Sequence, residues 1–234
     1  MRIARKNEVL GCALAACWLF CAAPALSAPG APAAPAYSAG LGCGPAPPGH
    51  PVKGRRDFRN MTSNADDLRD LNYHESYHIA PARKQLQAGN LQWDVMNNLN
   101  FVLVKVPNDH RALELLVQWD KAGGKSKSYP SPGCYLTWAA QFAPSDPMVW
   151  NYGGYFFYQK NDRKRAEQWW LKALEYDPAN ADVHYNLGLL YFAQGRYTDS
   201  RRHAEAAYAA GYPLPGLREK LRKVGHWTDP QPAR

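Results

Sequence analysis

In the last three quarters of the chain, apolar residues recur at the three- and four-residue spacing of helices, and no stretch shows the strict alternation of a strand. Residues 62–64 are Thr-Ser-Asn, which are N-cap residue types, and acids follow in the next turn, where the helix dipole favours them. Pro81 stops or restarts this helix, residues 89–90 form a Gly-Asn turn, and residues 91–106 form a further helix. The pattern therefore predicts an all-α protein.

Proline closes successive helical segments at a nearly constant interval. Pro107, Pro144 and Pro178 are separated by 37 and 34 residues, and Pro213 follows about one period later. A period of about 34 residues is the length of one helix–turn–helix unit in a repeat protein. Such a unit cannot bury its apolar side alone, so neighbouring units must stack.

Within this period, small and large residues are placed as packed helix pairs require. Small side chains let two helices approach closely, large rings fill the space between pairs, and the proline fixes the turn into the next unit. The small residues are Gly154, Ala166, Gly188 and Ala207, and the large ones are Trp150, Trp170 and Tyr191.

Over residues 110–214 the sequence resembles the tetratricopeptide repeat family. In residues 147–180, positions typical of the family are held by Trp150, Gly154, Phe157, Ala166, Trp170, Ala173 and Pro178. In residues 181–214, they are held by Leu187, Gly188, Tyr191 and Ala207. The departures are Gly153, where the family has leucine, and His184, Ser200 and Ala204 in the later repeat.

The resemblance implies a tetratricopeptide-like α-solenoid of about three to four helix hairpins, with a C-terminal capping helix and an irregular N-terminal arm. An apolar stripe of Leu214, Leu217, Leu221 and Val224 is expected to seat the cap. We expect these segments: 1–28, a signal peptide; 29–63, a Pro/Ala/Gly-rich linker and arm; 64–109, N-terminal helices; 110–214, the repeats; and 215–234, the cap and tail. A degenerate repeat over about residues 76–109 is an alternative interpretation of the N-terminal helices.

The first 28 residues have the pattern of a secretory signal peptide. A basic start is followed by an uncharged apolar run from Val9 to Ala25 and a small residue, Ala28, at a cleavage point. This pattern predicts a periplasmic or secreted protein. A membrane-anchoring helix is one alternative, and a lipid on Cys17, which follows Leu-Ala-Ala as in a bacterial lipobox, is another. A membrane partner is expected only if Cys17 is lipidated.

Cleavage after Ala28 would leave two cysteines, Cys43 and Cys134. An even pair in an oxidising compartment favours a disulfide, which would tie the N-terminal arm to the helices; two unrelated free thiols are the alternative. More loosely, the mature chain resembles secreted tetratricopeptide-repeat proteins of Gram-negative bacteria, in segments such as 54–59, 107–113 and 211–218.

The chain is basic, with a formal net charge of +8. The basic residues are scattered over the expected helices, as solvated faces would be, and secretion argues against a nucleic-acid partner. We therefore expect no nucleic-acid partner, and only a weak preference for acidic partners or anionic headgroups.

The resemblance also implies a binding surface, because the first helix of each repeat lines a concave groove in this family. Rigid aromatic surface with polar tips suits an extended or helical peptide segment. The family's carboxylate clamp is not supported, since only Asn186 fits it. The alternative is a groove filled by the N-terminal helices. The expected groove residues are Met148, Asn151, Tyr152, Tyr155, Tyr158, Asp182, Tyr185, Asn186, Leu189 and Phe192.

One motif points to catalysis instead. His74-Glu75-Ser76-Tyr77-His78 spells H-E-x-x-H, which on a helix can hold zinc with two histidines and use the glutamate as a general base. Pro81 and Lys84 stand where longer zinc-peptidase motifs have glycine and the third histidine.

The sequence therefore predicts a non-enzymatic adaptor or assembly scaffold that binds another protein or peptide segment and needs no cofactor. A zinc-dependent hydrolase using His74 and His78 is the alternative function, and a lipid-anchored assembly factor is a third.

Overall fold

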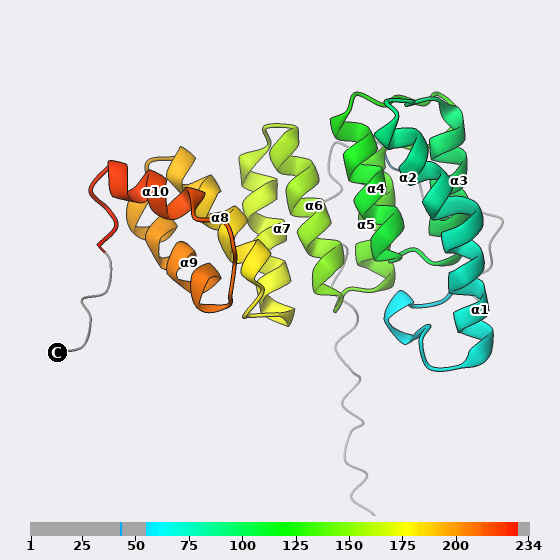
Figure 1. The fold of residues 1–234 in the computed structure, drawn as a ribbon, viewed down its shortest axis with the longest axis horizontal. Coiled ribbons are helices and arrows are strands. Elements are labelled where there is room, and N and C mark those ends of the chain that lie inside the picture. Colours follow the sequence, from blue (N-terminus) through cyan, green and yellow to red (C-terminus); the bar gives the residue numbers. More distant parts are fainter. Residues whose placement is uncertain (1–42, 44–54, 229–234) are drawn as a thin grey trace, which may run out of the picture. The chain divides into compact units, whose positions relative to one another are not determined.

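The computed structural model describes Cys43 and residues 55–228, all within one compact unit, Ala34–Arg234. The predicted signal peptide with Cys17, most of the predicted linker and the last six residues lie outside the described residues. In the described part every regular element is helical and no strand occurs. Figure 1 shows the helices following one another in chain order.

A short 3₁₀ turn, η2 (Phe58–Asn60), precedes the helices. The helices are α1 (Ala65–His74), a π-helical turn η3 (Glu75–Ile79), α2 (Ala80–Gln87), α3 (Trp93–Lys105), α4 (His110–Lys121), α5 (Pro132–Phe142), α6 (Pro147–Gln159), α7 (Arg163–Tyr176), α8 (Ala181–Ala193), α9 (Tyr197–Ala209) and α10 (Gly216–Lys223).

The first helical segment begins where the sequence predicts. The Asn64 side chain accepts a hydrogen bond from the Asp67 amide at 2.9 Å and caps α1. Pro81 does not interrupt the segment, because it lies in the first turn of α2, where a missing N–H is tolerated. The π-turn η3 joins α1 to α2 without a gap. The chain then turns at Gly89, whose φ of +72° suits glycine, and α3 packs on α2.

The remaining helices form successive packed pairs. Within the pairs α6 contacts α7 and α8 contacts α9, while α4 and α5 both contact α6, and α7 contacts α8. Aspartate or asparagine side chains accept backbone N–H bonds at the starts of four of these helices, α4, α6, α7 and α8. The prediction of an all-α, tetratricopeptide-like solenoid is confirmed.

The structure explains why glycine replaces the family's leucine at position 153. A Cβ at Gly153 would lie 1.8 Å from the Cε3 atom of Trp169, whose indole is completely buried. Gly154 has the same relation to Trp170, at 2.5 Å. Two adjacent tryptophans on α7 thus lie over two adjacent glycines on α6. The repeat pattern predicts a packing role for Trp170 but gives no signal for Trp169.

Two other departures from the family pattern form polar contacts between α8 and α9. The Ser200 hydroxyl donates to the Gly188 carbonyl at 2.8 Å. The Nδ1 atoms of His184 and His203 are 2.9 Å apart, and Nε2 of His184 lies 2.9 Å from the Pro178 carbonyl oxygen. Because a carbonyl can only accept, His184 carries its proton on Nε2 when neutral, and His203 donates from Nδ1.

This histidine pair predicts a loss of stability at acid pH. Burial, and then the proximity of His184, lowers the pKa of His203 to about 4. The unfolded chain therefore takes up a proton first, and stability present above about pH 6.5 is lost as the pH falls toward 4. We expect His203→Gln to reduce the slope of unfolding free energy between pH 6.5 and 4.5 by up to about 1.4 kcal/mol per pH unit.

Urea unfolding at a series of pH values measures this slope. His74, whose pKa is also lowered by burial, remains in the variant, so some dependence should persist. An unchanged slope in His203→Gln would contradict the protonation argument.

The C-terminal cap differs in part from the predicted apolar stripe. Leu217 and Leu221 are fully buried, but Leu214 is 56% exposed and Val224 39% exposed. The prediction for these two residues is wrong because α10 begins only at Gly216 and ends at Lys223, so neither lies within the helix. The cap is instead completed by the Tyr208 hydroxyl, which accepts from the Arg218 amide at 3.0 Å.

A buried polar network joins the N-terminal arm to the turns between helix pairs. Asn108 and Asp146 are completely buried. The Asn108 side-chain amide donates to Asp57 and to Asp146, each at 2.8 Å, and its Oδ1 accepts from the Phe58 amide at 3.0 Å. Nε2 of His110 lies 2.8 Å from Asp146. Burial alone would raise the pKa of Asp146, but the hydrogen bonds from His110 and Asn108 outweigh it and hold the pKa below its usual range.

Cys43 and Cys134 are adjacent in the structure. Their Cα atoms are 5.4 Å apart and their sulfur atoms are at bonding distance. Cys43 packs against the main core beside the first turn of α5. This placement brings together the two residues that the sequence pairs, and the formation of the bond in the protein stays a prediction.

Oxidation of this pair is expected to stabilise the fold by about 2–4 kcal/mol, because the bond would close a loop of 91 residues. Urea unfolding of the wild type and of Cys43→Ser/Cys134→Ser, each with and without reductant, measures the difference. Reductant should lower the midpoint of the wild type and leave that of the variant unchanged. Two free thiols per mature chain after oxidative purification would contradict the pairing.

Candidate functional site

The first helices of three successive pairs enclose a pocket of about 450 Å³. Helices α4, α6 and α8 each contribute side chains to its wall, and half-buried rings form part of that wall. The lining residues are Glu114, Val117, Gln118, Lys121, Asn151, Tyr152, Tyr155, Asp182 and Asn186.

Half of the expected groove residues line this pocket. Three come from α6 and two from α8, which places residues of two predicted repeats around one cavity. The structure adds a third wall, α4, which the sequence analysis missed. Residues five, nine and twelve of the 110–146 repeat are Glu114, Gln118 and Lys121, so the family register used for the later repeats would have found them.

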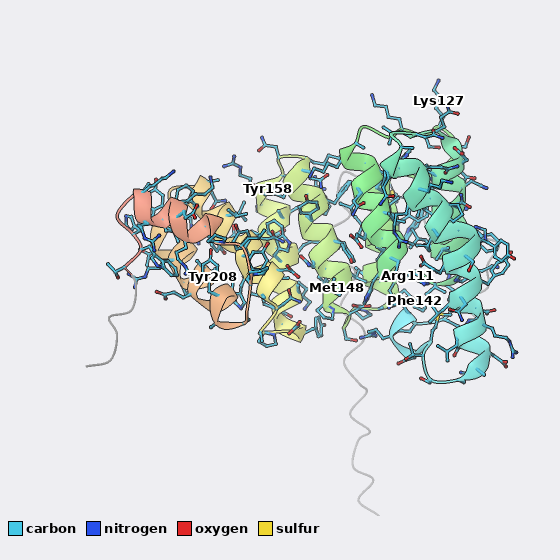
Figure 2. All side chains as sticks on the ribbon, viewed as in Figure 1. Arg111, Lys127, Phe142, Met148, Tyr158 and Tyr208 are labelled. Carbon is cyan, nitrogen blue, oxygen red and sulfur yellow. A yellow bond between two sulfur atoms is a disulfide. The ribbon has the colours of Figure 1, made fainter. Side chains whose placement is uncertain are left out.

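Two predicted residues lie at the ends of α6, away from the pocket. Figure 2 shows Met148 at the same end of the helices as Arg111 on α4, and Tyr158 at the opposite end. The Tyr158 ring lies 5.7 Å from the Trp170 ring and is partly exposed. The structure therefore places these two side chains outside the pocket lining.

The remaining three predicted residues pack beside the C-terminal part of the chain. Tyr185 is buried and stacks on Tyr212 with ring centroids 3.9 Å apart. Leu189 and Phe192 pack against the cluster that contains Leu217 of α10. Tyr185 is therefore not part of an open groove. Leu189 and Phe192 are half-buried beside the cap, and their place in the groove stays a prediction.

Asn151 is the most enclosed polar residue of the pocket. Its side chain is 8% exposed, and its Oδ1 accepts from the Trp170 indole at 3.1 Å. Its Nδ2 group makes no hydrogen bond to the described residues and is not buried away from solvent. The amide therefore presents a fixed, unused donor at the pocket wall.

The pocket is lined by two acidic residues, Glu114 and Asp182, and one basic residue, Lys121. Lys121 donates to the Tyr155 hydroxyl at 3.1 Å, which ties α4 to α6 at one end. Burial, followed by the charges of Glu114, Asp146 and Asp182, raises the pKa of Tyr152 well above its usual value. Tyr152 therefore stays protonated and can donate a hydrogen bond into this region.

The structure gives the H-E-x-x-H motif a packing role. His74 is buried, and burial lowers its pKa. His78 stacks on Phe101 with centroids 3.9 Å apart, and its Nδ1 lies 3.0 Å from Asn98. Glu75 forms ion pairs with Arg83 at 2.9 Å and Arg111 at 3.2 Å, so it is not placed as a free base.

No group of three or more potential metal ligands gathers anywhere in the part of the chain that is described. The two histidines therefore lack a third ligand there, and the zinc-hydrolase alternative is not supported. Within the same residues no helix has the length and apolarity needed to cross a bilayer.

The sequence model described as a TPR repeat matches residues 154–195. A tetratricopeptide repeat is present in this segment. It runs from the middle of α6 to the end of α8 and includes three of the pocket residues, Tyr155, Asp182 and Asn186. A comparison with curated proteins finds no match. Tetratricopeptide repeats generally bind other proteins or peptides and are generally not enzymes.

Proposed function

We propose that this protein is an adaptor that holds a segment of another protein in the pocket formed by α4, α6 and α8. The observation that carries the proposal is the pocket itself, whose wall contains the Asn151 amide donor and the half-buried rings of Tyr152 and Tyr155. A peptide backbone supplies carbonyl acceptors for such a donor, and its side chains cover aromatic surface.

The positions of the lining residues along the three helices limit the length of the ligand. Counted from the start of each helix, the lining residues range from the second position, in α8, to the last position, in α4. This range corresponds to more than two helical turns along the groove. Tyr185, Leu189 and Phe192 pack with residues of the cap, so we place the bound segment on the pocket residues and not on these three. A short extended segment fits this space better than a long helix.

The proposed location is the periplasm or the extracellular space, as the first 28 residues indicate. The adjacent cysteines support an oxidising compartment. The looser likeness to secreted repeat proteins of Gram-negative bacteria belongs to the same proposal.

Selection of peptides from a random display library on the immobilised chain tests the binding site. We expect the selected peptides to lose about tenfold or more in affinity for Gln118→Ala/Asn186→Ala, which removes two polar groups from the pocket wall. The control is Gln87→Ala/Gln168→Ala, which removes two exposed amides on α2 and α7.

Circular dichroism and urea unfolding of both variants establish that the fold is retained. Peptides that bind the pocket variant as tightly as the control would show that the ligand lies elsewhere, and the proposed site would then be abandoned.

A further inference from the structure

The pocket has an acidic wall built from two different helix pairs. Glu114 is the fifth residue of α4, and Asp182 is the second residue of α8. Both lie in the N-terminal halves of their helices, whereas Lys121 is the last residue of α4. One end of the pocket is therefore acidic and the other carries an amine.

Neither carboxylate is neutralised by the described part of the protein. Glu114 accepts a hydrogen bond only from the side-chain amide of Gln118, at 2.9 Å, and Asp182 has no hydrogen bond or ion pair there. By contrast, Asp120, which also lies on α4, forms an ion pair with Lys160 at 2.7 Å. Both carboxylates lie at the pocket, where burial and then their charges raise the pKa of the half-buried Tyr152.

A second feature indicates that the occupant is a polypeptide rather than a free cation. The Asn151 side chain is more than nine-tenths buried and lines the pocket, and its Nδ2 donor is unused among the described residues. A donor at the pocket wall can bond to an acceptor on the occupant, which a metal ion or an ammonium group lacks and a backbone carbonyl provides. The Tyr155 ring already has a cation near its face, since Nζ of Lys121 lies 5.7 Å from the ring centroid. The half-buried Tyr152 is a further aromatic residue of the pocket wall.

We infer that the pocket selects a segment carrying a lysine or arginine, whose cationic group is attracted to the acidic wall formed by Glu114 and Asp182. This inference rests on the proposed function. The Asn151 amide holds the backbone beside the basic residue, and Lys121 at the other end repels a second basic residue, so the bound segment has one direction. The recognised chemistry is a basic side chain in an extended peptide.

A positional-scanning library of synthetic peptides tests this selectivity on the purified chain. Each position in turn is fixed as Lys, Arg, norleucine or Glu, because norleucine has an apolar chain of similar length without the charge. At one position we expect Lys or Arg to bind about tenfold or more tightly than norleucine, as a charge-assisted hydrogen bond provides.

The variant Glu114→Gln/Asp182→Asn keeps the shape of the wall and removes its charge. It should bind the norleucine peptides as the wild type does and reduce the Lys or Arg preference to less than about twofold. The control Glu205→Gln/Glu219→Gln removes two exposed charges from α9 and α10 and should retain the preference.

Two results would overturn the inference while leaving the proposed function intact. Library peptides could bind, and be sensitive to Gln118→Ala/Asn186→Ala, yet show no basic preference at any position. Alternatively, the basic preference could persist in Glu114→Gln/Asp182→Asn. Peptides insensitive to the Gln118→Ala/Asn186→Ala pair would instead overturn both proposals.

Discussion

The substitution Gly153→Leu, which installs the residue usual in the tetratricopeptide family, is expected to destabilise this protein by about 3 kcal/mol. The first side-chain atom alone would lie 1.8 Å from Trp169, and Trp169 cannot move outward because its indole is completely buried. The better helix propensity of leucine recovers only about 1 kcal/mol. Urea unfolding followed by tryptophan fluorescence measures the loss.

A double-mutant cycle with Trp169→Ala identifies the cause. Removal of the indole alone should cost about 3–5 kcal/mol, because it leaves a large cavity. The variant Gly153→Leu/Trp169→Ala should be more stable than the sum of the single losses predicts, by about 2 kcal/mol, since the leucine occupies part of that cavity. Tyr158→Leu, at a partly exposed position on the same helix, serves as the control for leucine itself. Additive losses in the cycle would show that position 153 is not limited by Trp169.

Loss of the Asp146 carboxylate is expected to have the second large effect, about 3 kcal/mol for Asp146→Ala. Asp146 caps α6 by accepting from the Met148 amide at 3.1 Å, and it also accepts from Asn108 at 2.8 Å within a buried site. The substitution leaves the Asn108 donor without this acceptor and removes the carboxylate facing His110. Urea unfolding at pH 7 measures the change.

Asp162→Ala provides a matched comparison, because Asp162 caps α7 in the same way at a partly exposed position. Loss of this cap alone should cost about 1 kcal/mol. The excess for Asp146→Ala is then the contribution of the buried network that joins the arm to the helix turns. Equal losses of unfolding free energy in the two variants would mean that the contacts of Asp146 with Asn108 and His110 do not stabilise the fold.

The fold could be predicted from the sequence because its periodic features are local. Three kinds of signal each act within one helix pair. They are prolines at regular spacing, capping side chains such as Asn64 and Asn180, and glycines at helix crossings. Stacking follows because a single pair cannot bury its apolar side. These signals require no knowledge of distant contacts.

The site was only partly predictable because its limits depend on contacts between distant segments. Register along one repeat found Asn151 and Asn186, but it could not show that the cap would cover Tyr185. The H-E-x-x-H spacing is also a local signal, and it misled because the ion pairs that occupy Glu75 come from Arg83 and Arg111. Similarly, the pairing of Gly153 with Trp169 joins two helices and leaves no local pattern.

The central claim is that the surface shared by α4, α6 and α8 binds a peptide segment. Side-chain amide resonances in a ¹⁵N NMR titration test it directly, with a peptide selected on the wild-type chain as the ligand. We expect the resonances of Gln118, Asn151 and Asn186 to shift on binding, while those of Gln87 and Gln168 on exposed surfaces stay unchanged. Shifts at Gln87 or Gln168 with none at Asn151 and Asn186 would contradict the account.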